Sequence, residues 1–336
     1  MEGFDIPVVI FIFKREKAVE IINRIGQVKP KKLYILSDQG RNDEEKERVL
    51  ECRKKVEAAI DWDCEIIKNY ADENRGVYQN IGEGAKWVLR REKWAIFLED
   101  DNLPEITFFE FCKEMLHKYE NDTRILWVCG TNYLGEYTSK FGESYVFTKH
   151  MLPCGWASWS TKFELFYDGL LKNAEDEMVC DRMKKNYCNK RVYKQYRSLI
   201  MKEYERIKSG QRPVSWDYQM DFSIKANNLL GICPCRNQIK NIGVDSDSIH
   251  GGNTFDSVMT KRFCGMESYP LSFPLVHPTT VLVDDVFERK IGKIVLIPLV
   301  FRMRRAFKGM VVSLIRFFLR IPKNESVRSH IAMKKR

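Results

Sequence analysis

Three consecutive acids are the clearest chemical signal in this chain. Glu99, Asp100 and Asp101 directly follow the apolar run 94–98, which has the length and aromatic content of a buried strand. Open α/β sheets bind their ligands at the carboxyl ends of the strands. Adjacent carboxylates repel one another unless a cation shares their charge, and hard divalent cations prefer carboxylate oxygens. The triplet therefore predicts a metal and diphosphate site. The local sequence equally allows an acidic turn that caps a helix beginning at Pro104.

The elements that must position the triplet alternate regularly along the chain. Apolar runs predict strands at residues 7–13, 32–37, 64–68 and 94–98. Between these runs, apolar residues recur every three or four positions and predict helices through residues 18–25, 49–60 and 77–88. The fold class that we expect is α/β, with a Rossmann-like, mostly parallel sheet flanked by helices.

After the triplet this alternation continues for one more unit and then stops. A helix over 104–119 and a strand over 125–129 are predicted from their spacing. Residues 131–159 are rich in Gly, Ser and aromatics, which is typical of an active-site loop region, although a plain surface excursion has a similar composition. Residues 173–212 are dense in Lys, Arg, Glu and Tyr and predict a helical insertion with a solvated face, to which we assign no chemistry.

The composition is that of a globular protein. The chain has 336 residues, of which 44% are hydrophobic and 30% charged. Its ten cysteines are scattered and several lie in apolar runs, so we predict free thiols. Cys233 and Cys235 have no second pair at zinc-site spacing, which argues against a structural zinc. No basic and apolar signal segment precedes the first predicted strand, so we expect a cytoplasmic protein.

The positive charge is concentrated at the C-terminal end. The formal net charge is +10, and residues 286–336 contain 14 Lys or Arg and two Glu, a net of +12. The rest of the chain is therefore at −2. This distribution argues against a nucleic-acid surface and favours a local anionic partner, of which a membrane is the commonest for this pattern. We expect a main domain over 1–285 and a basic tail over 286–336.

The tail has the composition of an amphipathic helix. Its apolar segments 294–301 and 309–315 alternate with Arg and Lys residues, and neither segment approaches the roughly 18 apolar residues of a spanning helix. Basic residues beside Phe and Leu suit a helix that lies on an anionic membrane surface. A helix docked on the main domain with a solvated basic face is the alternative.

Five short segments, in order, resemble GT-A glycosyltransferases. They are Phe13-Lys14-Arg15, residues 36–41 (LSDQGR), Asn74-Arg75-Gly76, residues 97–101 (FLEDD) and residues 154–159 (CGWASW). The chain is most similar to bacterial nucleotide-diphospho-sugar transferases related to the enzyme that adds the first N-acetylglucosamine branch to eukaryotic N-glycans. The similarity runs from about residue 6 to residue 255.

The resemblance implies a metal at the triplet. In this family the triplet is the DXD element, whose last carboxylate holds Mn²⁺ or Mg²⁺ against the two phosphates of the donor. It therefore makes Asp101 the first metal ligand, with Glu99 beside it and Asp100 at the donor. Similar late histidines in the family complete the metal or phosphate site, which makes His250 a further candidate ligand. A loop histidine with an ordinary hydrogen bond is the alternative for His250.

The resemblance also implies residues that bind the donor. Asp38 matches a position that holds the nucleotide base or ribose, and Arg15 and Arg41 stand near it as base or phosphate contacts. Asn74 matches a helix-entry turn beside the donor, and Trp156 lies in a loop that faces the donor sugar and the acceptor. The structural alternatives are turn chemistry for Asp38, solvent exposure for both arginines, helix capping for Asn74 and core packing for Trp156.

An inverting transfer needs a general base for the acceptor hydroxyl. Asp217, in the segment Ser215-Trp216-Asp217, resembles the Trp-Asp segment of the related enzyme and is our candidate. Asp221, one helical turn further on, is the alternative base. Without the resemblance, Asp217 is equally well explained as an acid at a helix N-terminus.

Together these features predict a metal-dependent, inverting glycosyltransferase. We expect it to move a sugar from a nucleotide-sugar, a UDP-sugar by preference, to a surface polysaccharide or a lipid-linked glycan on the inner face of the cell membrane. A sugar-nucleotide nucleotidyltransferase is an alternative, but Gly82-Glu83-Gly84 is too short and misplaced for a phosphate-binding loop. A catalytically silent, membrane-associated scaffold of the same fold is the other alternative.

Overall fold

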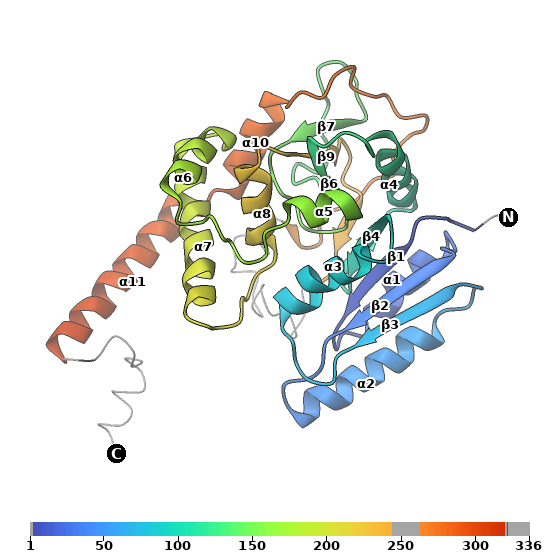
Figure 1. Ribbon diagram of the computed structural model, residues 1–336, viewed down its shortest axis with the longest axis horizontal. Helices are drawn as coiled ribbons and strands as arrows, with labels where there is room; N and C mark the ends of the chain where they lie inside the picture. Colours follow the sequence, from blue (N-terminus) through green and yellow to red (C-terminus); the bar gives the residue numbers. More distant parts are fainter. Residues whose placement is uncertain (1–2, 244–262, 320, 322–336) are drawn as a thin grey trace. The chain divides into compact units, whose positions relative to one another are not determined.

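The computed structural model describes residues 3–243, 263–319 and 321. Its centre is an eight-stranded sheet (Figure 1). In spatial order the strands are β3 (Glu65–Tyr70), β2 (Lys32–Ser37), β1 (Val8–Ile12), β4 (Trp94–Glu99), β8 (Trp156–Trp159), β6 (Ile125–Cys129), β9 (Leu230–Pro234) and β7 (Tyr145–Thr148). Within this described sheet, six strands run in one direction and β8 and β7 run against them. The prediction of an α/β fold with a mostly parallel sheet is confirmed.

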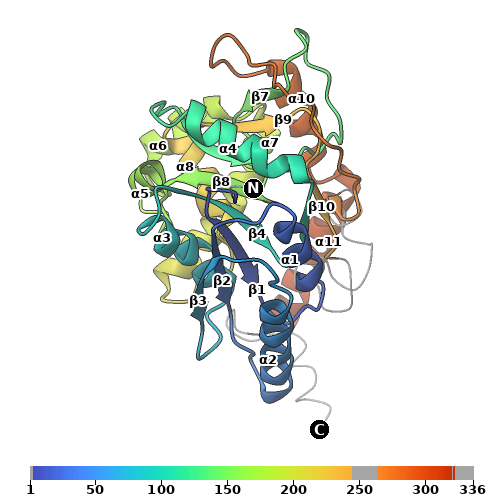
Figure 2. The same cartoon turned by 90° about the vertical axis from the view of Figure 1, so that its right-hand side faces the viewer.

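Helices cover the strands of this sheet. They include α1 (Ala18–Gly26), α2 (Asp43–Ala58), the π-helix η1 (Tyr78–Glu83), α3 (Gly84–Leu89), α4 (Ile106–Lys118) and α5 (Ser160–Phe166). The apolar stripe predicted for α1, from Ala18 to Ile25, is fully buried. Figure 2 shows α1 and α3 on opposite sides of strands β1 to β4. The first half of the chain therefore forms the alternating unit that its local periodicity predicts.

The triplet does not cap a helix, because the residues after it form a short strand. Strand β5 (Asn102–Pro104) pairs antiparallel with β10 (Ile239–Asn241) in a separate two-stranded sheet. Helix α4 begins only at Ile106, and its N-cap residue Glu105 makes no side-chain cap bond. The interpretation of the triplet as an acidic cap of a helix beginning at Pro104 is therefore wrong, because strand pairing with β10 separates the triplet from the helix.

The interpretation of residues 131–159 as a loop region is wrong in part. Strands β7 and β8 lie within this range, and all eight of their residues are buried. Short strands that are buried on both faces carry no alternation of apolar and polar residues, so their sequence does not identify them.

The segment 173–212 contains helices that pack beside the sheet. They are α6 (Glu177–Met183), the 3₁₀ turn η2 (Lys184–Asn186) and α7 (Lys190–Lys208), and α8 (Asp217–Ala226) follows them. Helices α6 and α7 both contact α8, as Figure 1 shows. The side chain of Asn189 caps α7 by accepting from the backbone N–H groups of Arg191 and Val192.

The chain divides into two compact units, Met1–Lys293 and Ile294–Arg336. Helix α10 (Asp285–Val295) begins in the first unit, where Phe287 and Ile291 are fully buried. The carboxylate of Glu288, also buried, accepts hydrogen bonds from the Thr148 hydroxyl and the Lys149 backbone N–H. The first residues of the predicted tail thus pack with the main unit.

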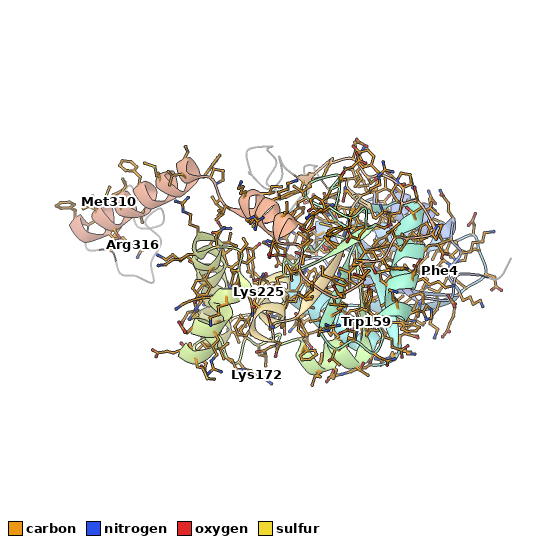
Figure 3. All side chains as sticks on the ribbon, turned by 90° about the horizontal axis from the view of Figure 1, so that it is seen from above. Phe4, Trp159, Lys172, Lys225, Met310 and Arg316 are labelled. Carbon is orange, nitrogen blue, oxygen red and sulfur yellow. The ribbon has the colours of Figure 1, made fainter. Side chains whose placement is uncertain are left out.

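The second unit contains helix α11 (Leu299–Phe318), on which Figure 3 labels Met310 and Arg316. Exposed apolar side chains recur along it every three or four residues, at Leu299, Met303, Phe307, Met310, Leu314 and Phe318, and Val300 and Phe301 are exposed as well. In the part of the chain that the structure describes, no helix combines the length and apolarity needed to cross a membrane.

Candidate active site

The triplet lies where two loops meet at the carboxyl edge of the sheet. Strands β1 and β4 are parallel neighbours, with Phe11 opposite Glu99, so both chains leave the sheet at the same edge. The loop after β1 contacts the triplet directly, because the backbone N–H of Phe13 donates to Asp100 Oδ2 at 3.1 Å. The strand order therefore places Arg15 beside the acids.

Arg15 binds two of the three acids. Its Nη1 lies 2.8 Å from Asp100 Oδ1 and 2.8 Å from Asp101 Oδ2. Burial raises the pKa of Asp100 to about 6, and the Arg15 charge opposes this shift. Burial also raises the pKa of Glu99 well above its usual range, and the charges of Asp101 and Asp100 raise it further. The triplet is therefore an acidic cluster that one guanidinium only partly compensates.

The segment after β10 packs against Asp101. The backbone N–H of Ile242 donates to the Asp101 carbonyl at 2.8 Å, and Lys17 Nζ donates to the Ile242 carbonyl at 2.7 Å. A Cβ atom on Gly243 would lie 2.2 Å from Asp101 Oδ2, so only glycine permits this approach. His250, the other candidate ligand, lies outside the described residues.

Asp38 and Asn74 come together, although they are 36 residues apart. The buried Asp38 carboxylate follows β2 and accepts four hydrogen bonds. Its donors are the backbone N–H groups of Gln39 (2.8 Å), Arg75 (2.7 Å) and Gly76 (2.9 Å) and the Asn74 side-chain amide (3.1 Å). Both carboxylate oxygens accept hydrogen bonds from residues 74–76, so Asp38 fixes the conformation of this turn.

Arg41 is held away from the triplet by another acid. Its guanidinium binds both oxygens of Glu45, and Lys14 Nζ lies 3.0 Å from the same carboxylate. Arg41, followed by its backbone N–H and Lys14, holds the pKa of Glu45 well below its usual range. The Arg41 side chain is 53% exposed. Arg41 is therefore a partly exposed residue of the loop after β2, and it shares the Glu45 carboxylate with Lys14 of the loop after β1.

Trp156 lies in the core. Its ring stacks on Phe97 at 4.0 Å and on Trp127 at 4.3 Å between centroids, and only 1% of the residue is exposed. Trp216 packs on it at 5.6 Å. The Trp156 indole N–H is buried and has no hydrogen-bond partner among the described residues. The predicted contact between this ring and a sugar is therefore not available here, because neighbouring aromatic rings cover its faces.

Asp217, the candidate base, acts on the triplet through its charge. It is the first residue of α8, is half-buried, and accepts a hydrogen bond from the Ser215 hydroxyl. In addition to burial and the neighbouring acids, the charge of Asp217 raises the pKa of Glu99. The fold therefore brings Asp217 close enough for its charge to affect the pKa of Glu99 in the triplet.

Asp221 is placed differently, although it lies only one helical turn from Asp217. It is 4% exposed and accepts a hydrogen bond from the Tyr187 hydroxyl at 3.0 Å. Burial raises its pKa to about 6, while Lys225 and the Tyr187 bond oppose this shift. Asp221 thus belongs to the packing between α8 and the residues after α6, whereas the charge of Asp217 acts on Glu99.

Three tyrosines near Asp217 were missed by sequence reasoning. Burial raises the pKa values of Tyr133, Tyr167 and Tyr196, and the charge of Asp217 raises each of them further. Tyr196 comes from α7, in the segment to which no chemistry was assigned. Tyr133 stacks on Phe263 with centroids 3.7 Å apart. For Tyr196 the high Tyr content of 173–212 was the available signal, but composition does not give the distance to Asp217.

The donor set of the triplet suits a hard cation. Among the described residues, no three His, Cys, Asp or Glu side chains form a ready-made metal site. Mg²⁺-type ions are commonly held by one or two carboxylates, with substrate phosphates and water completing the shell. The carboxylates of Asp100 and Asp101 already bind a cation, the Arg15 guanidinium. Asp101 and its neighbour Glu99 offer carboxylate oxygens of the kind that such an ion takes.

Comparisons with known proteins give only distant similarities. Neither a protein-family model nor a curated protein matches the chain. A mannosyltransferase from Pyrobaculum calidifontis, PcManGT, solved with GDP-Man and Mn²⁺, is 13% identical, covers 67% of this chain and 70% of its own, and gives a TM-score of 0.36. UDP-glucose pyrophosphorylase with UDP-glucose is 9% identical, covers 70% and 92% of the two chains, and gives 0.34. Similarities at this level do not assign the chain to a family.

Proposed function

We propose that this protein is a glycosyltransferase that transfers a sugar from a nucleotide-diphospho-sugar, a UDP-sugar by preference, with Mn²⁺ or Mg²⁺ and with inversion. The observation that carries the proposal is the acidic triplet at the end of β4, which Arg15 binds through Asp100 and Asp101. The charge of Asp217, the first residue of α8, also acts on Glu99. A leaving diphosphate needs positive charge, and an acceptor hydroxyl needs a base nearby. The site offers groups for both.

In the proposed mechanism Asp101 and Glu99 would hold the metal, which would stabilise the charge of the departing diphosphate as a Lewis acid. Arg15 supplies a second positive charge at the same place. The turn shaped by Asp38 and Asn74 forms the wall for the nucleotide. Asp217 accepts the proton of the acceptor hydroxyl while that oxygen attacks the anomeric carbon from the face opposite the diphosphate.

The competing nucleotidyltransferase function lacks a matching loop. Enzymes that bind a nucleoside triphosphate cradle its phosphates with backbone N–H groups of a glycine-rich loop. In this chain the turn between β1 and α1 consists of Phe13, Lys14, Arg15, Glu16 and Lys17, without glycine. Gly82 and Gly84 lie in η1 and α3 instead, where their neighbours are protein side chains. These features favour transfer over nucleotidyl chemistry.

Helix α11 supports an acceptor at a membrane surface. Six of its exposed apolar side chains, from Leu299 to Phe318, recur at helical spacing and form a stripe, and Phe307, for example, is 64% exposed. The segment Leu299–Phe318 contains five Arg or Lys and no acid. An apolar stripe on a cationic helix matches an anionic lipid surface. We therefore propose peripheral association with the inner face of the membrane and a lipid-linked glycan or surface polysaccharide as the acceptor.

A thermal-shift panel tests the proposed activity. Nucleoside diphosphates and nucleotide-sugars are added with and without Mn²⁺ to wild type and to Asp101→Asn. A ligand at a hundredfold excess over its Kd stabilises the native state by about 2.7 kcal/mol, so a Mn²⁺-dependent rise in Tm is expected for wild type. In Asp101→Asn the part of the Tm rise that depends on Mn²⁺ is expected to be absent.

The same samples separate the alternatives. Slow hydrolysis of the donor without acceptor supports the transferase. Release of pyrophosphate from a nucleoside triphosphate and a sugar phosphate supports the nucleotidyltransferase. Absence of any shift and of any turnover supports the silent scaffold.

A further inference from the structure

We propose that Arg15 is the resident cation of the free protein's acidic site, and that a divalent metal replaces it on Asp101 and thereby releases the guanidinium for the donor diphosphate. This inference rests on the proposed function and adds a regulation of its site. The observation behind it is a single nitrogen, Arg15 Nη1, that lies 2.8 Å from both Asp100 Oδ1 and Asp101 Oδ2.

The ion pair is mostly shielded from water. The side chains of Arg15, Asp100 and Asp101 are 16%, 9% and 16% exposed. Carboxylates in such a position need a cation nearby to remain charged. Before any metal or nucleotide arrives, the guanidinium supplies that charge. The site is therefore built to hold a cation at this place, and the cation present is a protein side chain.

The guanidinium and a metal would compete for the same oxygen. A divalent ion of the Mg²⁺ kind sits about 2.0–2.1 Å from its carboxylate oxygens. Asp101 Oδ2 already has the Gly243 backbone on one side, since a Cβ there would lie 2.2 Å from it, and Arg15 Nη1 on another. Two cations crowded on this oxygen would repel each other. Occupation of Asp101 by a metal therefore favours departure of Arg15.

The chain around Arg15 allows its head group to move while its backbone stays. The Arg15 carbonyl accepts hydrogen bonds from Ala18 N–H at 3.2 Å and from the Cys52 thiol at 3.3 Å. Asp100 keeps its bond from the Phe13 N–H whether or not Arg15 remains. The flexible arginine side chain can thus turn its charge from Asp101 to a phosphate without a change in the loop.

Metal affinity measured directly tests this exchange. Free Mn²⁺ is followed by electron paramagnetic resonance during titration of the full chain as wild type, Arg15→Gln and Arg15→Lys. Without the competing cation, Arg15→Gln should bind Mn²⁺ about tenfold more tightly, within the usual range of coupling between two ligands. Arg15→Lys, which keeps one positive charge, should fall between the two. UDP binding at saturating Mn²⁺ should be weaker in Arg15→Gln than in wild type.

Arg124→Gln is the matched control. Arg124 pairs with Asp122 before β6, and its side chain is 60% exposed. Its loss changes the net charge by the same unit, and Mn²⁺ affinity should stay at the wild-type value. Equal or weaker Mn²⁺ binding by Arg15→Gln, with clear binding by wild type, would overturn the exchange and leave the proposed function standing. Absence of Mn²⁺ and UDP binding in every variant would overturn both.

Discussion

The two aspartates of α8 differ in what their side chains touch. Asp217 accepts a bond from the Ser215 hydroxyl and acts on Glu99 across the site. Asp221 is buried against Tyr187 and lies close to Lys225. A general base must reach the acceptor hydroxyl, so the half-buried Asp217 is the better placed of the two. The two residues are both aspartates, so it is their hydrogen-bond partners that distinguish the candidate base from the structural acid.

Asp217→Asn should therefore lower kcat by about 10²–10⁴-fold, because the amide cannot accept the proton. The Ser215 hydroxyl can still donate to the amide oxygen, so the fold should be kept. Asp221→Asn, an equally conservative change, should retain most of the activity. Steady-state kinetics with saturating donor and Mn²⁺ compare the two. A large loss in Asp221→Asn alone would transfer the role of base to Asp221.

Among the secondary-structure elements, helix α10 is joined to the end of strand β7 by hydrogen bonds to the buried carboxylate of Glu288. Glu288 is 5% exposed and accepts from Thr148 at the end of β7 and from the next backbone N–H, Lys149. His150 Nε2 lies 3.4 Å from its other oxygen. Burial lowers the pKa of His150, although the Glu288 charge opposes this shift. These contacts hold the first turns of α10, where the basic C-terminal part of the chain begins, against the main unit.

Glu288→Ala is expected to lower the free energy of unfolding by about 3 kcal/mol, because it leaves buried hydrogen-bond donors without an acceptor. Urea denaturation measures this loss. Arg289→Ala removes the exposed neighbour on the same helix and should change the value by no more than about 0.5 kcal/mol. Similar losses in the two variants would mean that α10 as a whole, and not the Glu288 bonds, contributes the stability.

At the scale of the whole molecule, charge and apolar exposure separate along the chain. The first 285 residues have a formal net charge of −2, whereas residues 286–336 carry +12. The exposed stripe on α11 lies in this cationic part. A near-neutral body joined to a cationic amphipathic helix matches the proposed association with an anionic membrane surface.

Replacement of two stripe residues by acids tests this arrangement. Phe307→Glu with Leu314→Glu should weaken binding to phosphatidylcholine–phosphatidylglycerol vesicles at least about tenfold, since each apolar side chain contributes about 1.5–3 kcal/mol when buried. The control pair, Leu165→Glu with Leu170→Glu, changes two exposed leucines of the main unit and the same net charge. Vesicle sedimentation measures both. Equal binding by the two doubles would contradict insertion of the stripe.

The sequence alone determined the elements whose signals are local. The strands at 32–37 and 125–129 and the buried stripe of α1 follow from apolar spacing, because side chains three or four residues apart share a helix face and short apolar runs fit a buried sheet. The acidic triplet at the end of a strand was likewise evident from the order of residues. These features depend only on neighbours in the chain.

The tertiary structure decided which distant residues meet. That Arg15 binds Asp100 and Asp101, that Asp38 shapes the turn of Asn74, and that Trp156 is enclosed by aromatic rings are contacts across many residues of sequence. Such contacts depend on the order of strands in the sheet and on the path of 131–243, where local periodicity is weak. Residue types therefore predicted the kind of chemistry, and only the packed sheet assigned each residue its partner.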